Sequence, residues 1–249
     1  MKILALDSSG IVASVAVVED DTLLAEYTVN YKKTHSQTLL PMLDEIVKMT
    51  ELELESIDAI AVAAGPGSFT GLRIGSATAK GLGLALKKPL VAVPTVDALA
   101  YNLYDAQGLI CPIMDARRKQ VYTGIYRFEE HQLKTLKDQW AAPVEELLEE
   151  LNRRGEAVTF LGDGVPVFRE LIAEKLKVPY SFAPAHVNKQ RAAAVAALGS
   201  IYYKEGRTQT DVEHVPEYLR VSQAERERAE REHRNRQGQL YDPERDACR

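Results

Sequence analysis

A glycine-rich loop at residues 65–71, with the sequence GPGSFTG, is the stretch whose residue types come closest to a known chemistry. It follows an apolar run and precedes a helix-prone segment, and free backbone N–H groups at a helix start can bind anions. The spacing of known phosphate loops is absent, because Leu72 stands where a Walker A loop needs Lys and Thr70 where the dinucleotide fingerprint needs glycine. A nucleophile elbow around Ser68 is also missing, since Pro66 and Thr70 occupy its glycine positions. Both an anion site and a tight strand-to-helix turn remain open.

Two aspartates form a second candidate site. Asp7 ends the first apolar run of the chain, and Asp115 ends a similar run in the second half. Acids at equivalent strand ends, facing a cleft between two repeats, suit a phosphate-bound Mg²⁺. The alternative is that each aspartate caps a turn between strands. Arg117 and Arg118 favour this alternative, because they follow Asp115 where a triphosphate cleft needs closely approaching glycine backbone.

The histidines and cysteines predict no metal centre. The five histidines are far apart, with no two at i, i+4, and zinc ligands usually come in close pairs. His35 stands among polar neighbours before a helix, where we expect a capping or surface role. Cys111 and Cys248 make neither a disulfide framework nor a zinc ligand set.

Composition narrows the function classes further. The chain has 249 residues, 45% of them apolar, with 31 basic against 36 acidic residues and a formal net charge of −5. A protein that binds nucleic acid without a partner usually has more basic than acidic residues, so autonomous nucleic-acid binding is disfavoured. The N-terminal apolar stretch stops at Asp7, which is too short for a signal peptide, and no run approaches the roughly 20 apolar residues of a membrane span. We therefore expect a cytoplasmic protein without membrane contact.

The elements that must position these residues occur twice in the same order. The first hundred residues predict strands at 2–6, 11–19, 22–29, 57–64 and 90–93, with helices at 36–51 and 72–86. The second half predicts strands at 109–114, 120–128, 132–137 and 157–161, with helices at 143–153, 165–176 and 188–203. This pattern indicates an α/β fold with an internal repeat of about a hundred residues.

The two helices of the first repeat also predict an interface. The apolar side chains of 36–51 span an arc of about 180°, wider than the roughly 100° stripe that packing on a sheet requires. In 72–86, Gly75, Gly81 and Gly83 each cost roughly 1 kcal/mol of helix stability, which close approach to another helix would offset. We expect a helical subunit interface, although packing on each other and on their own sheet is the alternative. The expected interface residues are Leu39, Met42, Leu43, Ile46, Val47, Ile74, Ala77, Gly81 and Leu84.

The C-terminal residues differ in kind from the rest. Within 223–236 only two alanines are apolar, so the segment has no stripe to bury. Glu and Arg at four-residue spacing favour a solvated helix or a frayed tail, and a docking tail for a partner is the sharper alternative. We expect an N-terminal repeat at 1–97, a C-terminal repeat at 98–221 and a charged tail at 222–249.

Several of these segments together carry a family resemblance. ILALDSSG, KKTHSQTLLPMLDEI and IDAIAVAAGPGSFTGLRIGSATAKGLGLAL, followed by VPTVDALA, resemble the TsaB (YeaZ) family of partner subunits in bacterial tRNA threonylcarbamoyladenosine biosynthesis. The resemblance is strong over residues 1–125 and continues weakly to Glu225. It implies a duplicated fold of the actin, Hsp70 and sugar-kinase type, which is ribonuclease H-like, with a degenerate cleft.

The same resemblance implies a noncatalytic role. TsaB-like proteins pair with TsaD, which transfers the threonylcarbamoyl group to adenosine, and the ATPase TsaE joins them. TsaD carries two metal-binding histidines at i, i+4, whereas here Leu39 stands four residues after His35. The sequence Asp-Ser-Ser-Gly from Asp7 departs from the Asp-x-Gly-Thr phosphate pattern, and Gly-Asp-Gly from Gly162 only partly matches the adenosine motif. No catalytic residue, metal or cofactor is implied, and the residues of a vestigial cleft would be Asp7, Ser9, Gly65, Gly67, Asp115, Gly162 and Gly164.

The resemblance also implies the partners. TsaB-like chains pair with the TsaD-type transferase, and with a second copy of themselves as a homodimer, through the helices that correspond to 36–51 and 72–86. tRNA would be reached only through the complex. On this view Leu43→Asp or Gly81→Arg weakens both assemblies without unfolding the monomer. Two other functions stay open: an ATP-dependent phosphotransferase, motivated by Asp7 and Asp115, and a glycoprotease-like peptidase, which lacks both the histidine pair and a nucleophile elbow.

Overall fold

Two five-stranded sheets organise the protein in the computed structural model, which describes residues 1–31 and 33–220. The first sheet has the order β3-β2-β1-β4-β5 and the second the order β10-β9-β6-β7-β8. The strands of the first are β1 (Lys2–Asp7), β2 (Ala13–Glu19), β3 (Thr22–Val29), β4 (Ala59–Gly65) and β5 (Leu90–Pro94). Those of the second are β6 (Leu109–Asp115), β7 (Gln120–Glu129), β8 (Gln132–Pro143), β9 (Val158–Leu161) and β10 (Tyr180–Phe182).

The two sheets repeat one topology. In the first, β1 pairs antiparallel with β2 and parallel with β4, while β2 pairs antiparallel with β3 and β4 parallel with β5. In the second, β6 pairs antiparallel with β7 and parallel with β9, while β7 pairs antiparallel with β8 and β9 parallel with β10. Counted from the start of each half, both orders are 3-2-1-4-5. The internal repeat that the sequence predicts is therefore confirmed, and the fold is a duplicated, ribonuclease H-like α/β fold.

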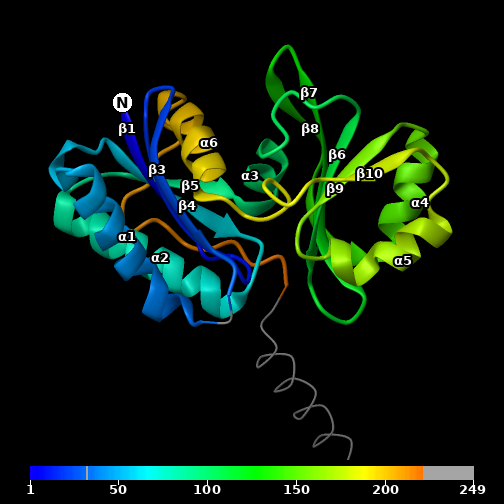
Figure 1. Ribbon diagram of the computed structural model, residues 1–249, viewed down its shortest axis with the longest axis horizontal. Coiled ribbons are helices and arrows are strands. Elements are labelled where there is room, and N and C mark those ends of the chain that lie inside the picture. Colours follow the sequence, from blue (N-terminus) through cyan, green and yellow to red (C-terminus); the bar gives the residue numbers. More distant parts are fainter. Residues whose placement is uncertain (32, 221–249) are drawn as a thin grey trace, which may run out of the picture.

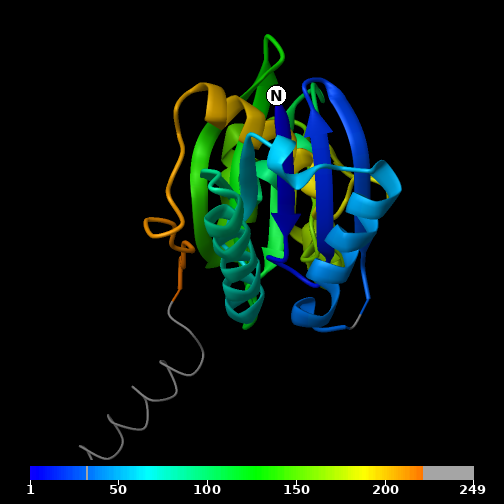
Figure 2. The same cartoon turned by 90° about the vertical axis from the view of Figure 1, so that its left-hand side faces the viewer.

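Helices cover both faces of the first sheet. Helices α1 (His35–Thr50) and α2 (Phe69–Leu86) lie side by side on one face, as Figure 2 shows. Helix α6 (Ala192–Lys204) covers the opposite face, where Gly199 lets it approach β4 so closely that a Cβ would lie 2.6 Å from the Cβ of Ala61. The apolar core of this half therefore has two layers, one on each side of the sheet.

The second half is built in the same way. Helices α4 (Val144–Arg154) and α5 (Val165–Lys175) pack on the face of the second sheet that points away from the first half (Figure 1). The short helix α3 (Thr95–Tyr101) packs on the other face, between the halves. A 3-10 turn, η1 (Leu54–Ser56), precedes β4.

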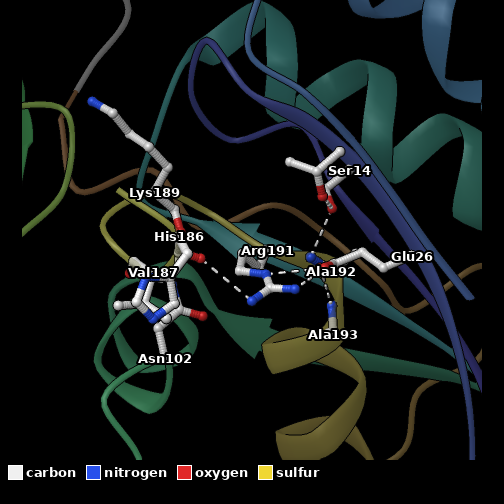
Figure 3. Close-up of polar contacts among 10 residues, drawn as sticks. Ser14, Glu26, Asn102, His186, Val187, Lys189, Arg191, Ala192 and Ala193 are labelled. Carbon is white, nitrogen blue, oxygen red and sulfur yellow. Dashed lines mark hydrogen bonds and ion pairs between the residues drawn. The ribbon is translucent and has the colours of Figure 1, made fainter. Parts of the chain in front are cut away.

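The placement of α6 bears on the expected domain division. This helix belongs by sequence to the expected C-terminal repeat at 98–221, yet its buried side chains join the core of the first sheet. Its N-terminus is held there by two residues of the first sheet: the N–H of Ala192 donates to Ser14 Oγ at 2.9 Å, and the N–H of Ala193 donates to Glu26 Oε1 at 3.0 Å. Arg191 also pairs with Glu26 (Figure 3). The division by sequence and the division by packing thus differ at this helix, and the expected boundary at 97/98 stays a prediction.

A second contact ties together the two connections between the halves. The side-chain amide of Asn102, just after α3, donates to the carbonyl oxygens of Val187 at 3.1 Å and Lys189 at 2.7 Å. Asn102 lies on the connection that leaves the first half, whereas Val187 and Lys189 lie on the connection that returns to it (Figure 3). The Asn102 amide is therefore one of several polar contacts that, together with apolar packing, fix the relative position of the sheets.

Several expected elements differ from those observed. Helix α2 begins at Phe69 instead of 72, because Ser68 caps it by accepting the N–H of Gly71. Pro41 lies inside α1, although we expect proline only near a first turn. The sequence analysis does not predict α3 or β10, and it ends β8 six residues early. None of the helices in the described ranges is long and apolar enough to cross a bilayer. The expected tail at 222–249 lies outside the described residues.

Candidate functional site in the cleft between the halves

A cavity of about 670 Å³ opens where the carboxyl ends of β1 and β6 face each other. Its walls are the β1–β2 turn, the glycine loop, the β6–β7 turn and residues 217–220. Of the predicted cleft residues, Ser9, Gly67 and Asp115 line the cavity. Gly162 and Gly164 flank Asp163, which lines it too, whereas Asp7 and Gly65 are buried and do not line it.

The Asp7 carboxyl group is used inside the fold. It is 1% exposed, and its Oδ1 accepts the N–H of Ser9 at 2.9 Å and the hydroxyl of Ser9 at 2.6 Å. Burial raises its pKa to about 6, against the opposing effect of the Ser9 hydrogen bonds and the His35 ring. A buried carboxyl group that holds its own turn fits the capping interpretation better than a Mg²⁺ ligand.

The Asp115 carboxylate also holds a turn. Its Oδ1 accepts the N–H of Arg117 at 2.8 Å, and its Oδ2 lies 3.7 Å from the Arg117 guanidinium. The N–H of Asp115 itself donates to Asp163 Oδ1 at 3.2 Å, and burial raises the pKa of Asp163. Within the described part of the chain, no three His, Cys, Asp or Glu side chains come together as a metal site requires.

The glycines of the cleft let the chain approach its own carbonyl oxygens. A Cβ on Gly67 would lie 2.3 Å from the oxygen of Ser9, and the same oxygen accepts the N–H of Ser68 at 2.7 Å. These glycines let loops of this chain pack closely on one another, and the oxygens of Ser9 and Ile113 accept hydrogen bonds within the fold. The tight-turn interpretation of the loop therefore fits the geometry better than an anion site. The corresponding contacts are Gly65 with Glu217 O (2.2 Å), Gly71 with Ser8 O (2.1 Å), and Gly162 and Gly164 with Ile113 O (2.2 and 2.9 Å).

The C-terminal segment fills part of this cleft, which the sequence analysis does not predict. The N–H of Glu217 donates to the oxygen of Ala64 at 2.7 Å, beside Gly65 in its left-handed conformation (φ 122°). The Tyr218 ring stacks at 4.7 Å from the ring of Phe69, which belongs to the glycine loop. Figure 1 shows this orange segment passing between the halves. Its contacts are single side chains without periodic spacing, so no pattern in the sequence reveals them.

The predicted interface residues separate into two groups. Leu39, Met42, Leu43 and Ile46 are at most 5% exposed and pack into the core between α1 and the first sheet. The expectation that Leu43→Asp leaves the monomer folded is therefore wrong, because the substitution would bury a charge. In the second group Val47 and Ile74 are half-buried, and Ala77, Gly81 and Leu84 are exposed.

Two further apolar side chains of the α1 arc are exposed, although they are not among the expected interface residues. Leu40 is 55% and Met49 is 77% exposed, and they lie at the two opposite edges of the arc. The helical wheel shows a wide apolar arc, but it does not show which part of that arc the sheet covers. The sheet therefore covers the middle of the arc and leaves its two edges exposed.

The three glycines of α2 have different surroundings. A Cβ on Gly75 would lie 2.4 Å from Ser8 Oγ, and one on Gly83 would lie 2.9 Å from a methyl carbon of Leu90. A Cβ on Gly81 would meet nothing within 4 Å. Packing within this chain explains the first two glycines, whereas no contact among residues 1–31 and 33–220 explains Gly81.

The duplicated fold, with a cleft between its two repeats, defines a class: a protein of the actin, Hsp70 and sugar-kinase type. Over 225 residues the chain is 35% identical to "tRNA threonylcarbamoyladenosine biosynthesis protein TsaB" of Bacillus subtilis (strain 168), covering 90% of this chain and 96% of that protein. It is 32% identical over 225 residues to the TsaB of Escherichia coli (strain K12), covering 88% and 95%. The chain belongs to the TsaB (YeaZ) family.

Two further comparisons agree with this family. The family model described as "TsaD: tRNA N6-adenosine threonylcarbamoyltransferase" matches residues 22–228. The structure is also similar to a crystal structure of a Pseudomonas aeruginosa protein described as having "similarity to peptidase YEAZ", with a TM-score of 0.74 and 26% identity, covering 88% of this chain and 99% of that one.

Proposed function

We propose that this chain is a noncatalytic subunit that pairs with a TsaD-type threonylcarbamoyltransferase, together with a TsaE-type ATPase, in threonylcarbamoyladenosine modification of tRNA. One observation supports the noncatalytic part: the carboxylates that end β1 and β6 hold turns, because Asp7 is buried and bonded to Ser9 and Asp115 is bonded to Arg117. The substrate class follows from the curated relatives, whose names place them in this modification. Because its substrate is tRNA, the proposed activity belongs in the cytoplasm.

The outer face of α1 and α2 is the proposed docking surface for the transferase, and for a second copy of the chain in its absence. We define this docking face by its exposed small and apolar residues. Gly81 supports the proposal, because it lowers helix stability although no described part of the chain packs against it. A close helix–helix contact with a partner is the common use of such a glycine. The members of the docking face are Leu40, Ala77, Gly81 and Leu84.

The test of this function is a pull-down of the full chain with a TsaD-type transferase, using surface variants. Leu84→Asp places a charge on a side chain that is 68% exposed, so the monomer should stay folded while binding of the transferase falls at least tenfold. Val167→Asp is the matched control, because Val167 is 58% exposed on a helix of the other half. Equal binding by both variants would refute the docking face.

A further inference from the structure

The turn between β6 and β7 carries three consecutive basic residues in an unusual conformation. Arg117, Arg118 and Lys119 are exposed and have positive φ angles of 67°, 55° and 58°. Arg117 lines the cleft, and the carbonyl oxygen of Ala116 in the same turn accepts a hydrogen bond from Arg220 at 2.7 Å. The turn therefore stands at the rim of the cleft, beside the last described residue.

The backbone of this turn does not explain its residue types. The left-handed region favours Gly, Asn and Asp, because a longer side chain crowds the backbone there. Elsewhere in the described ranges, non-glycine residues with positive φ occur singly, or as the pair Glu130 and His131. Three in succession, all with long cationic side chains, place three positive charges on a turn that would be less strained with glycine, asparagine or aspartate.

The charge of the turn is only partly used within the fold. Arg117 pairs with Asp115 at 3.7 Å. Among the described residues, Arg118 and Lys119 have no ion pair within 4.0 Å. The chain as a whole has a net charge of −5, so this turn is a local basic cluster on an acidic protein. Such a cluster attracts an anionic partner to one place.

The wall opposite the turn offers a different kind of contact. The rings of Phe69 and Tyr218 lie 4.7 Å apart, and Tyr218 is 37% exposed. The hydroxyl residues Ser68 and Thr70 are exposed beside them and line the same cavity. Partly exposed aromatic rings next to hydroxyl groups and cations are typical of sites that stack an unpaired base and hold its backbone.

We propose that this rim binds RNA, with phosphate groups on the turn at residues 117–119 and an unpaired base against Tyr218, since the Arg73 guanidinium covers the Phe69 ring at 4.0 Å. The inference rests on the proposed function, which supplies tRNA as the RNA. The carboxylates of Asp115 and Asp163 line the interior of the cleft and repel phosphate, so the phosphates stay at the rim. The same repulsion disfavours a free nucleoside triphosphate, because its phosphates would have to enter the interior of the cleft.

The test uses the double variant Arg118→Gly/Lys119→Gly. Glycine adopts a positive φ without strain, so the variant loses two charges and keeps the turn. Full-length chains, each in complex with a TsaD-type transferase, are titrated with a fluorescent unmodified tRNA transcript at several salt concentrations. Losing two phosphate contacts should raise Kd severalfold at about 0.1 M salt and should lower the slope of log K against log salt by about 1 to 2. Lys87→Gly is the matched control, because Lys87 is also basic and exposed, has a φ of 54°, and does not line the cleft.

A second variant tests the aromatic wall. Tyr218→Leu should weaken tRNA binding without changing the salt slope, because stacking releases no counterions. An unchanged Kd and slope for the double variant would overturn the inference. Displacement of tRNA by MgATP would overturn it in favour of a nucleotide site, and loss of co-elution with the transferase would overturn it in favour of a protein contact. Failure of the wild-type chain to co-elute would refute the proposed function, and this inference with it.

Discussion

The Asp7 carboxyl group stands where a kinase of this fold class would need a charged metal ligand, yet burial raises its pKa from 3.8 to about 6. In the folded protein it therefore binds a proton between about pH 4 and 6 that the unfolded chain releases. Stability from this residue is greatest below about pH 4 and falls as the pH rises toward 6. The Asp7 charge therefore destabilises the folded protein above about pH 6, and replacing it with a neutral side chain should raise the free energy of unfolding.

Asp7→Asn tests this assignment. The amide oxygen still accepts both Ser9 hydrogen bonds, but the side chain carries no charge. The variant should have a free energy of unfolding about 1–3 kcal/mol higher than the wild type at pH 7.5, and the difference should shrink toward pH 4. Urea denaturation at both pH values measures it, with the exposed Asp21→Asn as control. A destabilised variant at pH 7.5 would contradict the account.

At the scale of the element, the glycines of α2 give a paired prediction. Gly81→Ala should raise the free energy of unfolding by up to about 1 kcal/mol, because it improves helix propensity and meets no neighbour within 4 Å. Gly83→Ala should lower it, because the new methyl group meets Leu90 at 2.9 Å and the oxygen of Lys88 at 3.2 Å. Thermal or urea unfolding of the two variants compares them directly. Equal effects would show that Gly81 also has a packing role in the monomer.

The buried and exposed leucines of the two helices give a second paired prediction. Leu43→Ala should cost about 2–5 kcal/mol, because it opens a cavity between α1 and the sheet. Leu84→Ala should change stability by no more than about 0.5 kcal/mol, because Leu84 is largely exposed. A large loss of stability for Leu84→Ala in the monomer would remove it from the docking face.

Most of the helices and strands can be predicted from the sequence. The buried strands and long helices have strong apolar patterns, so their number, order and repeat are predicted, with bounds a few residues off. α3 and β10 have only seven and three residues, too few for a period to show. The wide arc of α1 indicates two apolar surfaces, but Leu39 and Leu40 differ in burial only because of the sheet beneath them. The spacing of Gly65 and Gly67 marks a tight loop, whereas the carbonyl oxygens opposite them come from distant segments.

At the scale of the whole molecule, the cleft is closed by parts far apart in sequence. The return of α6 to the first sheet and the seating of Tyr218 on Phe69 both depend on residues beyond 180, where the sequence has no motif. Because the Asp7 and Asp115 carboxylates hold turns and are not free to bind Mg²⁺, the isolated chain should show no MgATP binding by titration calorimetry at micromolar to sub-millimolar concentrations. Tight binding would revive the phosphotransferase alternative.

The central claim is that the chain acts by assembling with a transferase. Reconstituted threonylcarbamoylation of an unmodified tRNA by a TsaD-type enzyme and a TsaE-type ATPase, with and without this chain, tests it most directly. Product should form only when the chain is present. Gly81→Arg and Leu84→Asp should abolish product formation, whereas Asp7→Asn and Asp115→Asn should leave it unchanged. Full activity without the chain, or loss of activity through the two aspartates with the docking face intact, would contradict it.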